Sequence, residues 1–153
     1  KQIPVTIGTD RCVNEAITVD GKEYYITCVS MGNPHAVTFV DDTDSLPLEQ
    51  LGPHFEKHEA FPDRVNTEFV QVLNRKEVKM RVWERGSGET KACGTGACAC
   101  MYASYLLGLC DRDVFVDLLG GRLHITYEDG HIFMEGEAKR IFEGIINEED
   151  FYV

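Results

Sequence analysis

Apolar and polar residues alternate along much of this chain, which is the pattern of strands with one buried face. Two such runs, CVNEAITV and KEYYITCVSM, flank Asp20-Gly21 and predict a hairpin with a tight turn. A second hairpin is predicted from TEFVQVLN (67–74) and EVKMRVWE (77–84). Shorter runs predict the remaining strands, which are AVTFV (36–40), DVFVDLLG, GRLHITY, HIFMEGEA and KRIFEGIIN.

Two segments have helical rather than alternating spacing. GACACMYASYLLGL, which follows Thr95, is apolar nearly all round and predicts a buried helix. Residues 47–58, PLEQLGPHFEKH, carry apolar residues at helical spacing and predict a short surface helix that Pro53 limits. A sheet and a buried helix cover each other's apolar surface. The predicted fold is therefore α+β, a largely antiparallel sheet wrapped around one central buried helix, in a single domain over residues 1–153.

Composition narrows the functional classes. A formal charge of −11 argues against nucleic acid and anionic membrane surfaces, because both attract clustered Lys and Arg. No apolar run approaches the roughly 18 residues of a membrane helix, and the N-terminus lacks the apolar core of a signal peptide. Six cysteines in 153 residues are too sparse for a small disulfide scaffold. We therefore expect a cytoplasmic protein with reduced thiols and neither a nucleic-acid nor a membrane partner.

Three segments combine polar and small residues in a way that packing does not require: Met31–His35, Arg64–Phe69 and Glu84–Ala97. In the third, glycines lead into the predicted buried helix, whose first backbone N–H groups have no partners within the helix. Those groups and the helix dipole favour a carboxylate or a phosphate. The same field stabilises a thiolate, so we expect a lowered pKa for Cys93 at the helix mouth.

This arrangement leaves several chemical roles open. A thiolate at Cys93 can act as a nucleophile, or it can remove a proton from the carbon that carries a bound carboxylate. Glu84 and Arg85 supply opposite charges for the ammonium and carboxylate groups of an amino acid. Alternatively, the segment is a glycine-rich turn that binds nothing.

Other polar residues give weaker patterns. His54 and His58 lie four residues apart, as metal ligands on one helix face do, but Pro53 and their exposed setting weaken that interpretation. The remaining cysteines do not have zinc or thioredoxin spacing. We interpret Cys12 as a core residue and predict no metal site.

The run ERGSGETKACGTGACA closely resembles the signature of the diaminopimelate epimerase family, pyridoxal-independent isomerases of lysine and peptidoglycan-precursor synthesis. VSMGNPHAVTFV (29–40), RVNTEFVQV (64–72) and EGEAKRIFEGII fit the same family in the same order. The resemblance implies an isomerase that needs no cofactor and moves a proton between two cysteines, one of which is Cys93.

The resemblance also implies roles for the other site residues. Gly94 and Thr95 would bind the carboxylate at the reacting centre, and Arg85 would hold the distal carboxylate in a bidentate grip. Asn33 and Asn66 would bind the same distal end. His35 and Glu84 would tune the protonation of the cysteines, and Glu84 would also help to hold the substrate.

One family feature is missing from this chain. The family's first cysteine lies in a Gly-Asn-Gly-x-Arg-Cys type motif, and residues 8–12 have only the Arg-Cys pair. The chain therefore resembles the C-terminal half of the enzyme, with the N-terminal domain absent. We expect an inactive isolated chain whose partners are a small amino-acid substrate and the N-terminal half. Its apolar docking face would favour a homodimer.

Two other functions are consistent with the sequence. The helix mouth can serve a non-catalytic module that binds a carboxylate or phosphate, or the chain can be a proline racemase-like isomerase. Glu84, Arg85 and the asparagines favour a substrate with a polar far end, as in diaminopimelate. The expected location is the cytoplasm, or the plastid stroma if a transit peptide has been removed.

Overall fold

The computed structural model describes residues 3–8, 11–145 and 147. Within these ranges the chain forms nine strands and two helices, which follow one another as β1 (Glu15–Val19), β2 (Lys22–Ser30), β3 (Pro34–Phe39), α1 (Leu48–Glu56), β4 (Asn66–Asn74), β5 (Glu77–Glu84), β6 (Gly88–Thr90), α2 (Gly94–Leu106), β7 (Asp113–Leu118), β8 (Gly121–Glu128) and β9 (His131–Gly136). The α+β class and both predicted hairpins are confirmed.

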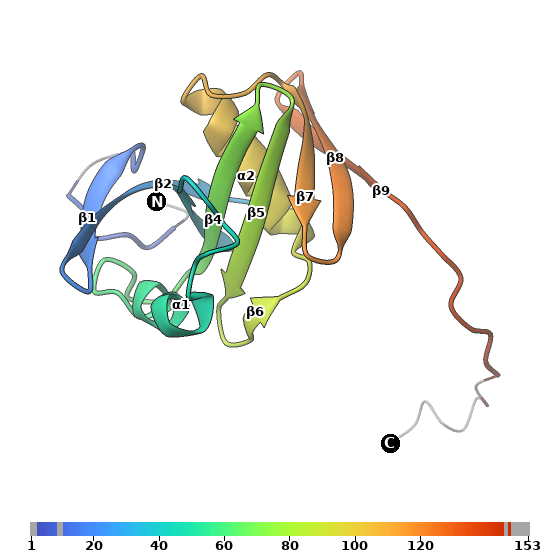
Figure 1. Cartoon of the computed structure of the whole chain (residues 1–153), viewed down its shortest axis with the longest axis horizontal. Helices are drawn as coiled ribbons and strands as arrows, with labels where there is room; N and C mark the ends of the chain where they lie inside the picture. The colour runs from blue at the N-terminus through green and yellow to red at the C-terminus, as the bar shows by residue number, and fades with distance from the viewer. Residues whose placement is uncertain (1–2, 9–10, 146, 148–153) are drawn as a thin grey trace.

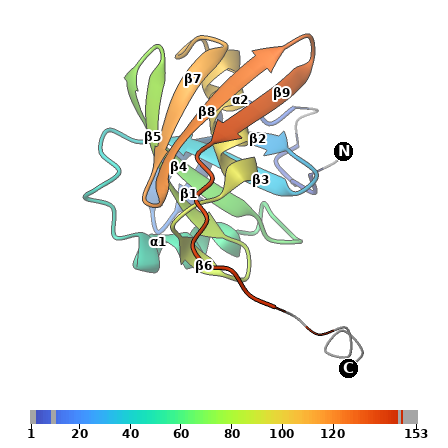
Figure 2. The ribbon, with the colours of Figure 1, turned by 90° about the vertical axis from the view of Figure 1, so that its right-hand side faces the viewer.

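All nine strands belong to one sheet, ordered β1-β2-β3-β4-β5-β7-β8-β9, with β6 paired to β5 outside this path. Most neighbours are antiparallel, but β3 pairs with β4 and β5 pairs with β7 in parallel. The connections between these parallel strands contain α1 and α2, as a parallel crossover requires. Helix α2 contacts β2, β3, β4, β5, β7, β8 and β9, and Figures 1 and 2 show the sheet curving around it.

The two faces of the sheet carry two separate cores. Successive strand residues point to opposite faces, so Val37 and Val70 pack in the core around α2, while their neighbours Ala36 and Phe69 pack in the core around α1. Helix α2 is buried along most of its length, as its apolar sequence predicts. Neither helix in the described ranges has the length and apolar character that a membrane crossing requires.

Helix α1 continues three residues beyond Pro53, which was expected to limit it. Proline removes one helical N–H, so the turn that contains it needs tertiary support. Phe55 provides that support, since its ring is fully buried and packs edge-on against Phe69 at a centroid distance of 5.1 Å. The backbone N–H of Lys57 also donates to the Pro53 carbonyl, which closes the last turn.

The glycine-rich segment between β5 and α2 contains a short strand, β6, which forms a hairpin with β5. Glu84 pairs with Gly88, and positive φ angles of 80° at Gly86 and 82° at Gly88 allow the chain to turn back on itself. Arg81 on β5 holds Glu89 on β6 through two hydrogen bonds of 2.7 and 3.0 Å. The hairpin therefore gives a fixed geometry to the approach to α2.

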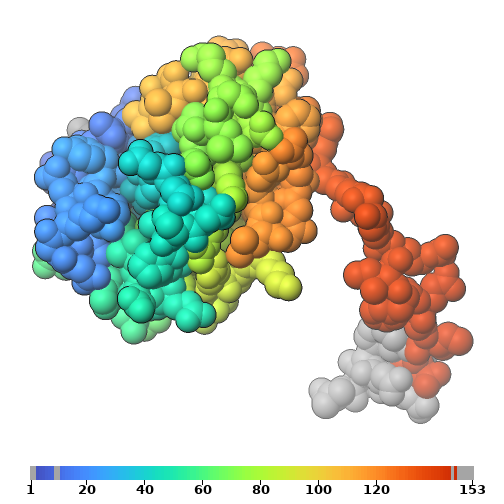
Figure 3. Space-filling model, viewed as in Figure 1, coloured from blue at the N-terminus to red at the C-terminus, as the bar shows by residue number. Residues whose placement is uncertain are grey.

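The predicted strand KRIFEGIIN is wrong over the part that the structure describes. Residues 137–145 and Asn147 belong to no strand or helix, and Figure 3 shows residues 137–145 extending away from the rest of the chain. Ile141, Phe142 and Ile145 are 91%, 82% and 96% exposed. A strand needs a neighbouring strand for its hydrogen bonds, and this segment pairs with none in the described ranges.

Candidate active site

The alternation of side chains along three neighbouring strands gathers polar residues under the N-terminus of α2. On β4, Asn66 and Glu68 have the same parity as Val70, which packs against α2. On β3, His35 has the same parity as Val37, and on β5, Glu84 has the same parity as Val82. Because β3 and β4 run parallel with His35 opposite Asn66, the polar ends of these strands meet at one edge of the helix core.

Cys93 is the N-cap residue of α2, as its place in the sequence predicts. Its sulfur accepts a hydrogen bond from the Gly96 backbone N–H at 3.3 Å and lies 3.5 Å from the Thr95 hydroxyl. The residue is only 7% exposed. A thiol at this position faces the positive end of the helix dipole while its surroundings exclude most water.

The expected lowering of the Cys93 pKa is wrong. Burial raises the pKa of the thiol, and the hydrogen bonds from Thr95 and Gly96 oppose that rise without cancelling it. The carboxylates of Glu68 and Glu84 raise the pKa further by repelling a thiolate. The prediction from the sequence considered only the helix dipole and left out desolvation and the two carboxylates. Because of these two effects, Cys93 holds its proton more firmly than a free cysteine does.

A continuous set of polar contacts runs from the sheet to Cys93. Oε1 of Glu68 lies 2.6 Å from Nδ1 of His35, and Nε2 of His35 lies 2.9 Å from Oδ1 of Asn33. The Asn33 amide nitrogen donates to the Thr95 hydroxyl oxygen at 3.4 Å. His35 and Asn33 were predicted as site residues, and both lie in this set.

Glu68 lies in the segment Arg64–Phe69, but the sequence alone did not predict it as a site residue. The available signal is a carboxylate at a core-facing position of a strand, between Asn66 and Val70. The side chain is fully buried, and burial raises its pKa, whereas His35 opposes that rise. A β-carbon added to Gly96 would come within 2.8 Å of Glu68 Oε1, so the helix start and this carboxylate are closely packed.

The predicted residues Asn66 and Arg85 are joined directly. The Asn66 amide nitrogen donates to the Pro34 carbonyl at 3.0 Å, and its oxygen accepts from the Arg85 backbone N–H at 2.8 Å. Asn66 is therefore a link between β3 and the end of β5. The Arg85 side chain is exposed, and one of its nitrogens donates to the Asp63 carbonyl at 3.1 Å. Its remaining donors are available for a carboxylate.

The other predicted residues lie around the same helix end. The Thr90 hydroxyl donates to Glu84 Oε1, which fixes that carboxylate beside the β5–β6 hairpin. Thr95 is exposed and Gly94 is half-buried, so their backbone groups are accessible at the helix mouth. A β-carbon on Gly94 would meet the Met134 sulfur at 3.0 Å, which places β9 against this edge.

His54 and His58 lie outside this cluster. His54 Nδ1 contacts Asp20 Oδ2 at 2.5 Å, and His58 Nε2 donates to the Thr18 carbonyl at 3.0 Å. In the described ranges, no three His, Cys, Asp or Glu side chains form a group that could hold a metal. Cys12 is buried in the core around α1, which confirms the interpretation made from the sequence.

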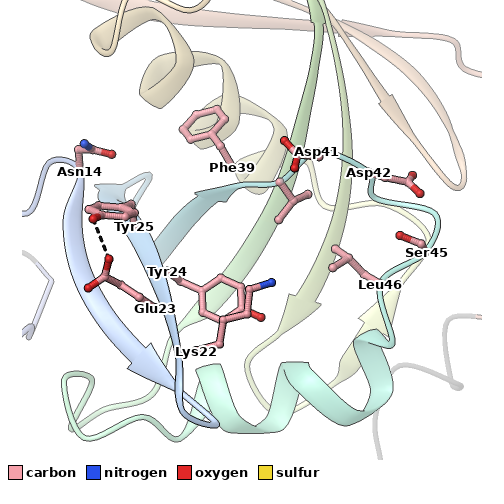
Figure 4. Close-up of a pocket in the computed structure, with 11 residues that line it drawn as sticks. Asn14, Lys22, Glu23, Tyr24, Tyr25, Phe39, Asp41, Asp42, Ser45 and Leu46 are labelled. Atoms are coloured by element: carbon pink, nitrogen blue, oxygen red, sulfur yellow. Dashed lines mark hydrogen bonds between the residues drawn. The ribbon is translucent and has the colours of Figure 1, made fainter.

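A well-defined pocket lies elsewhere on the molecule. A groove of about 570 Å³ is lined by residues of β2 and of the segment after β3, including Tyr24, Tyr25, Asp41 and Asp42 (Figure 4). It contains none of the predicted site residues. At the start of α2, Thr95 is exposed beside Cys93, which is itself 7% exposed.

Comparison with solved structures shows which known proteins share the fold of this chain. A phenazine biosynthesis protein of the PhzF family from Enterococcus faecalis aligns with a TM-score of 0.53 at 18% identity, covering 69% of this chain and 40% of that one. A PhzF-family protein from Bacillus anthracis aligns with a TM-score of 0.51 at 26% identity, covering 78% and 40%. The fold of this chain therefore occurs in those proteins, where the matched part makes up 40% of each chain.

The sequence comparison identifies the family within that class. The family model "Diaminopimelate epimerase" matches residues 27–141, and the chain belongs to this family. Diaminopimelate epimerase from Acetivibrio thermocellus is 50% identical over 149 residues, which are 96% of this chain and 53% of that protein. The Gloeothece citriformis protein of the same name is 52% identical over 148 residues, 94% of this chain and 53% of that protein. The chain thus spans about half the length of the curated relatives it matches.

Proposed function

We propose that this chain is one half of a diaminopimelate epimerase and supplies Cys93 as one of two acid/base cysteines. The whole enzyme would convert LL-diaminopimelate to the meso form, a step in lysine and peptidoglycan-precursor synthesis. The observation that carries the proposal is the position of Cys93, an N-cap thiol that contacts the Thr95 hydroxyl and lies within the influence of the carboxylates of Glu68 and Glu84. Family membership selects diaminopimelate, rather than proline, as the substrate to test.

The proposed chemistry is a proton exchange at one carbon. A thiolate from the other half takes the α-proton, which breaks the C–H bond and leaves its electron pair on carbon. The Cys93 thiol then gives its proton to the opposite face of that carbon, so Cys93 ends as the thiolate and the other cysteine ends as the thiol. The raised pKa of Cys93 supports the protonated starting state. In the reverse direction the two cysteines exchange these roles.

The residues around Cys93 would hold the amino acid for this exchange. The N–H groups at the start of α2, with Gly94 and Thr95, would stabilise the charge that develops on the α-carboxylate as the proton leaves. Arg85 would bind the distal carboxylate through its free donors, and Glu84 would attract an ammonium group. Asn33 and the second amide hydrogen of Asn66 would bind the distal end of the substrate.

The proposed partner is the N-terminal half of the enzyme, which would cover the start of α2 beside Cys93. Two large apolar side chains of β9, Phe133 and Met134, are 53% and 51% exposed. Met134 lies against Gly94, so the apolar surface reaches the helix mouth. Apolar surface that adjoins a polar site is typical of an interface.

A chimera tests the function. The matched half of the Acetivibrio thermocellus protein is replaced by this chain, and conversion of LL- to meso-diaminopimelate is followed by chiral chromatography. We expect activity from the chimera and none from the 153-residue chain alone. A folded but inactive chimera, or equal activity from the chain alone, would contradict the proposal. If the chimera is inactive but the chain binds diaminopimelate or phosphate in calorimetry, the non-catalytic binding module becomes the better description.

A further inference from the structure

Glu68 has a buried carboxyl group in this site, and the proposed reaction gives that group no role. Glu68 and His35 are both 0% exposed, and they face each other at 2.6 Å. The second carboxylate oxygen of Glu68 has no hydrogen-bond partner. Burying a carboxylate with incomplete hydrogen bonding is costly. Because the only side-chain hydrogen-bond partner of the Glu68 carboxyl in the described ranges is His35, the cost of burying it points to a function for the Glu68–His35 pair.

Hydrogen-bond direction can be assigned along the contacts that start at Glu68. The Asn33 amide nitrogen faces Thr95, so its oxygen faces His35. An amide oxygen only accepts hydrogen bonds, so His35 must carry a hydrogen on Nε2. Glu68 and His35 Nδ1 then share one further proton, either as carboxylate and imidazolium or as carboxylic acid and neutral imidazole. Both forms keep the hydrogen on Nε2.

The direction continues to the sulfur of Cys93. The Thr95 oxygen accepts from Asn33, which leaves the hydroxyl hydrogen of Thr95 free to point at Cys93. The contact of 3.4 Å from Asn33 to the Thr95 oxygen is long for an N–H···O hydrogen bond, whereas 3.5 Å is an ordinary distance from a hydroxyl to a sulfur. Hydrogen bonds of catalytic groups are often long in a free enzyme and shorten when substrate binds.

We propose that Glu68 is a positioning residue: through His35 and Asn33 it orients the Thr95 hydroxyl so that it donates to Cys93. All the residues that orient the Thr95 hydroxyl lie in this chain, so the orientation can be tested without the other half of the enzyme. Its importance for proton transfer rests on the proposed function of Cys93. Glu68 touches neither the sulfur nor the substrate, so its effect passes through the residues between them.

Glu68 has a second, opposite effect on Cys93, since its negative charge repels a thiolate. The two effects must be separated in any experiment. The titratable groups that face Glu68 from the elements packed around it are His35, Glu84, Cys28, Cys93 and Cys100. Two substitutions that remove the charge equally but differ in hydrogen bonding separate positioning from repulsion.

Glu68→Gln and Glu68→Leu form this matched pair. A glutamine amide can donate to His35 Nδ1 with its oxygen in the place of the unpartnered carboxylate oxygen, so the hydrogen stays on His35 Nε2. Leucine offers no partner and releases the ring. In the 153-residue chain, alkylation of Cys93 by iodoacetamide near neutral pH is measured by mass spectrometry of its peptide. We expect E68Q to react at least as fast as the unsubstituted chain, and E68L to react roughly tenfold more slowly than E68Q.

The Thr95 hydroxyl provides an independent check. Thr95→Val should slow alkylation of Cys93 by a similar factor, whereas Thr95→Ser, which keeps the hydroxyl, should not. In the E68L background, T95V should add little, because the donor is already misplaced. Equal rates for E68L and E68Q, or a full T95V effect in E68L, would overturn the proposal.

A measurement on the unsubstituted chain keeps the proposal testable even if E68L does not fold. Two-dimensional ¹H–¹⁵N spectra of the histidine rings report which nitrogen carries hydrogen. We expect hydrogen on Nε2 of His35, and an unprotonated Nε2 would overturn the proposal. These measurements need no substrate. An inactive chimera would therefore count against the proposed function while leaving the Glu68 result intact.

Discussion

Oε1 of Glu68 lies 2.6 Å from Nδ1 of His35, and the two residues are 33 positions apart in the sequence. They meet because β3 and β4 pair in parallel and both side chains point toward α2. Glu68 and His35 are therefore held on strands rather than on loops. Strands hold side chains in a narrower range of positions than loops do.

Stability should depend on pH through Glu68. Burial raises the pKa of this carboxyl in the folded chain, so the folded state holds more protons than the unfolded state. The free energy of unfolding then falls as the pH rises from the unfolded value near about 4.3 toward the raised folded value. Urea unfolding at a series of pH values should show a flatter profile for Glu68→Gln. Glu49→Gln, at an exposed position, serves as the control and should follow the unsubstituted chain.

Glu84→Gln should make Cys93 more reactive. The Glu84 carboxylate raises the pKa of Cys93, although less than burial does, and the substitution removes that repulsion. Glutamine can still accept from the Thr90 hydroxyl, so the hairpin should persist. We expect alkylation of Cys93 near neutral pH to be roughly two- to fivefold faster. Glu128→Gln on exposed β8 should leave the rate unchanged; an equal increase there would show that net charge alone is responsible.

Cys93→Ala should abolish epimerisation in the chimera. The loss should be at least about 10³-fold if Cys93 is one of two proton-transfer groups. Cys98→Ala on the same helix removes a thiol that has no role in the proposed reaction, so most activity should remain. Chiral chromatography of the product measures both variants. Substantial turnover by the Cys93 variant would remove this residue from the mechanism.

Gly52→Ala should destabilise the fold. Alanine in place of glycine favours a helix by about 1 kcal/mol, but its β-carbon would lie 2.3 Å from the Trp83 ring. Trp83 also donates to Glu56 at 2.8 Å, and moving the ring would break that bond. We expect a net loss of about 2 kcal/mol in the free energy of unfolding. Gln50→Ala, at an exposed position of the same helix, should change stability little in the same urea experiment.

The sequence by itself determined the features that depend on neighbouring residues. Alternation of apolar and polar residues located both hairpins, and the apolar run after Thr95 located the buried helix. Three motifs in family order identified the family and placed Cys93 at the helix mouth. These signals are strong because strand and helix periods, and the open N–H groups at a helix start, are local properties of the chain.

The tertiary structure decided what depends on distant parts of the chain. The parallel pairing of β3 and β4 brought Glu68 to His35, which no local pattern indicates. The helix dipole suggested a lowered pKa for Cys93, but burial and two carboxylates from other strands reversed the direction. Residues 139–145 have strand-like composition but pair with no strand within the described ranges. Pairing, desolvation and charge repulsion depend on which segments meet, so each is settled only when the chain has folded.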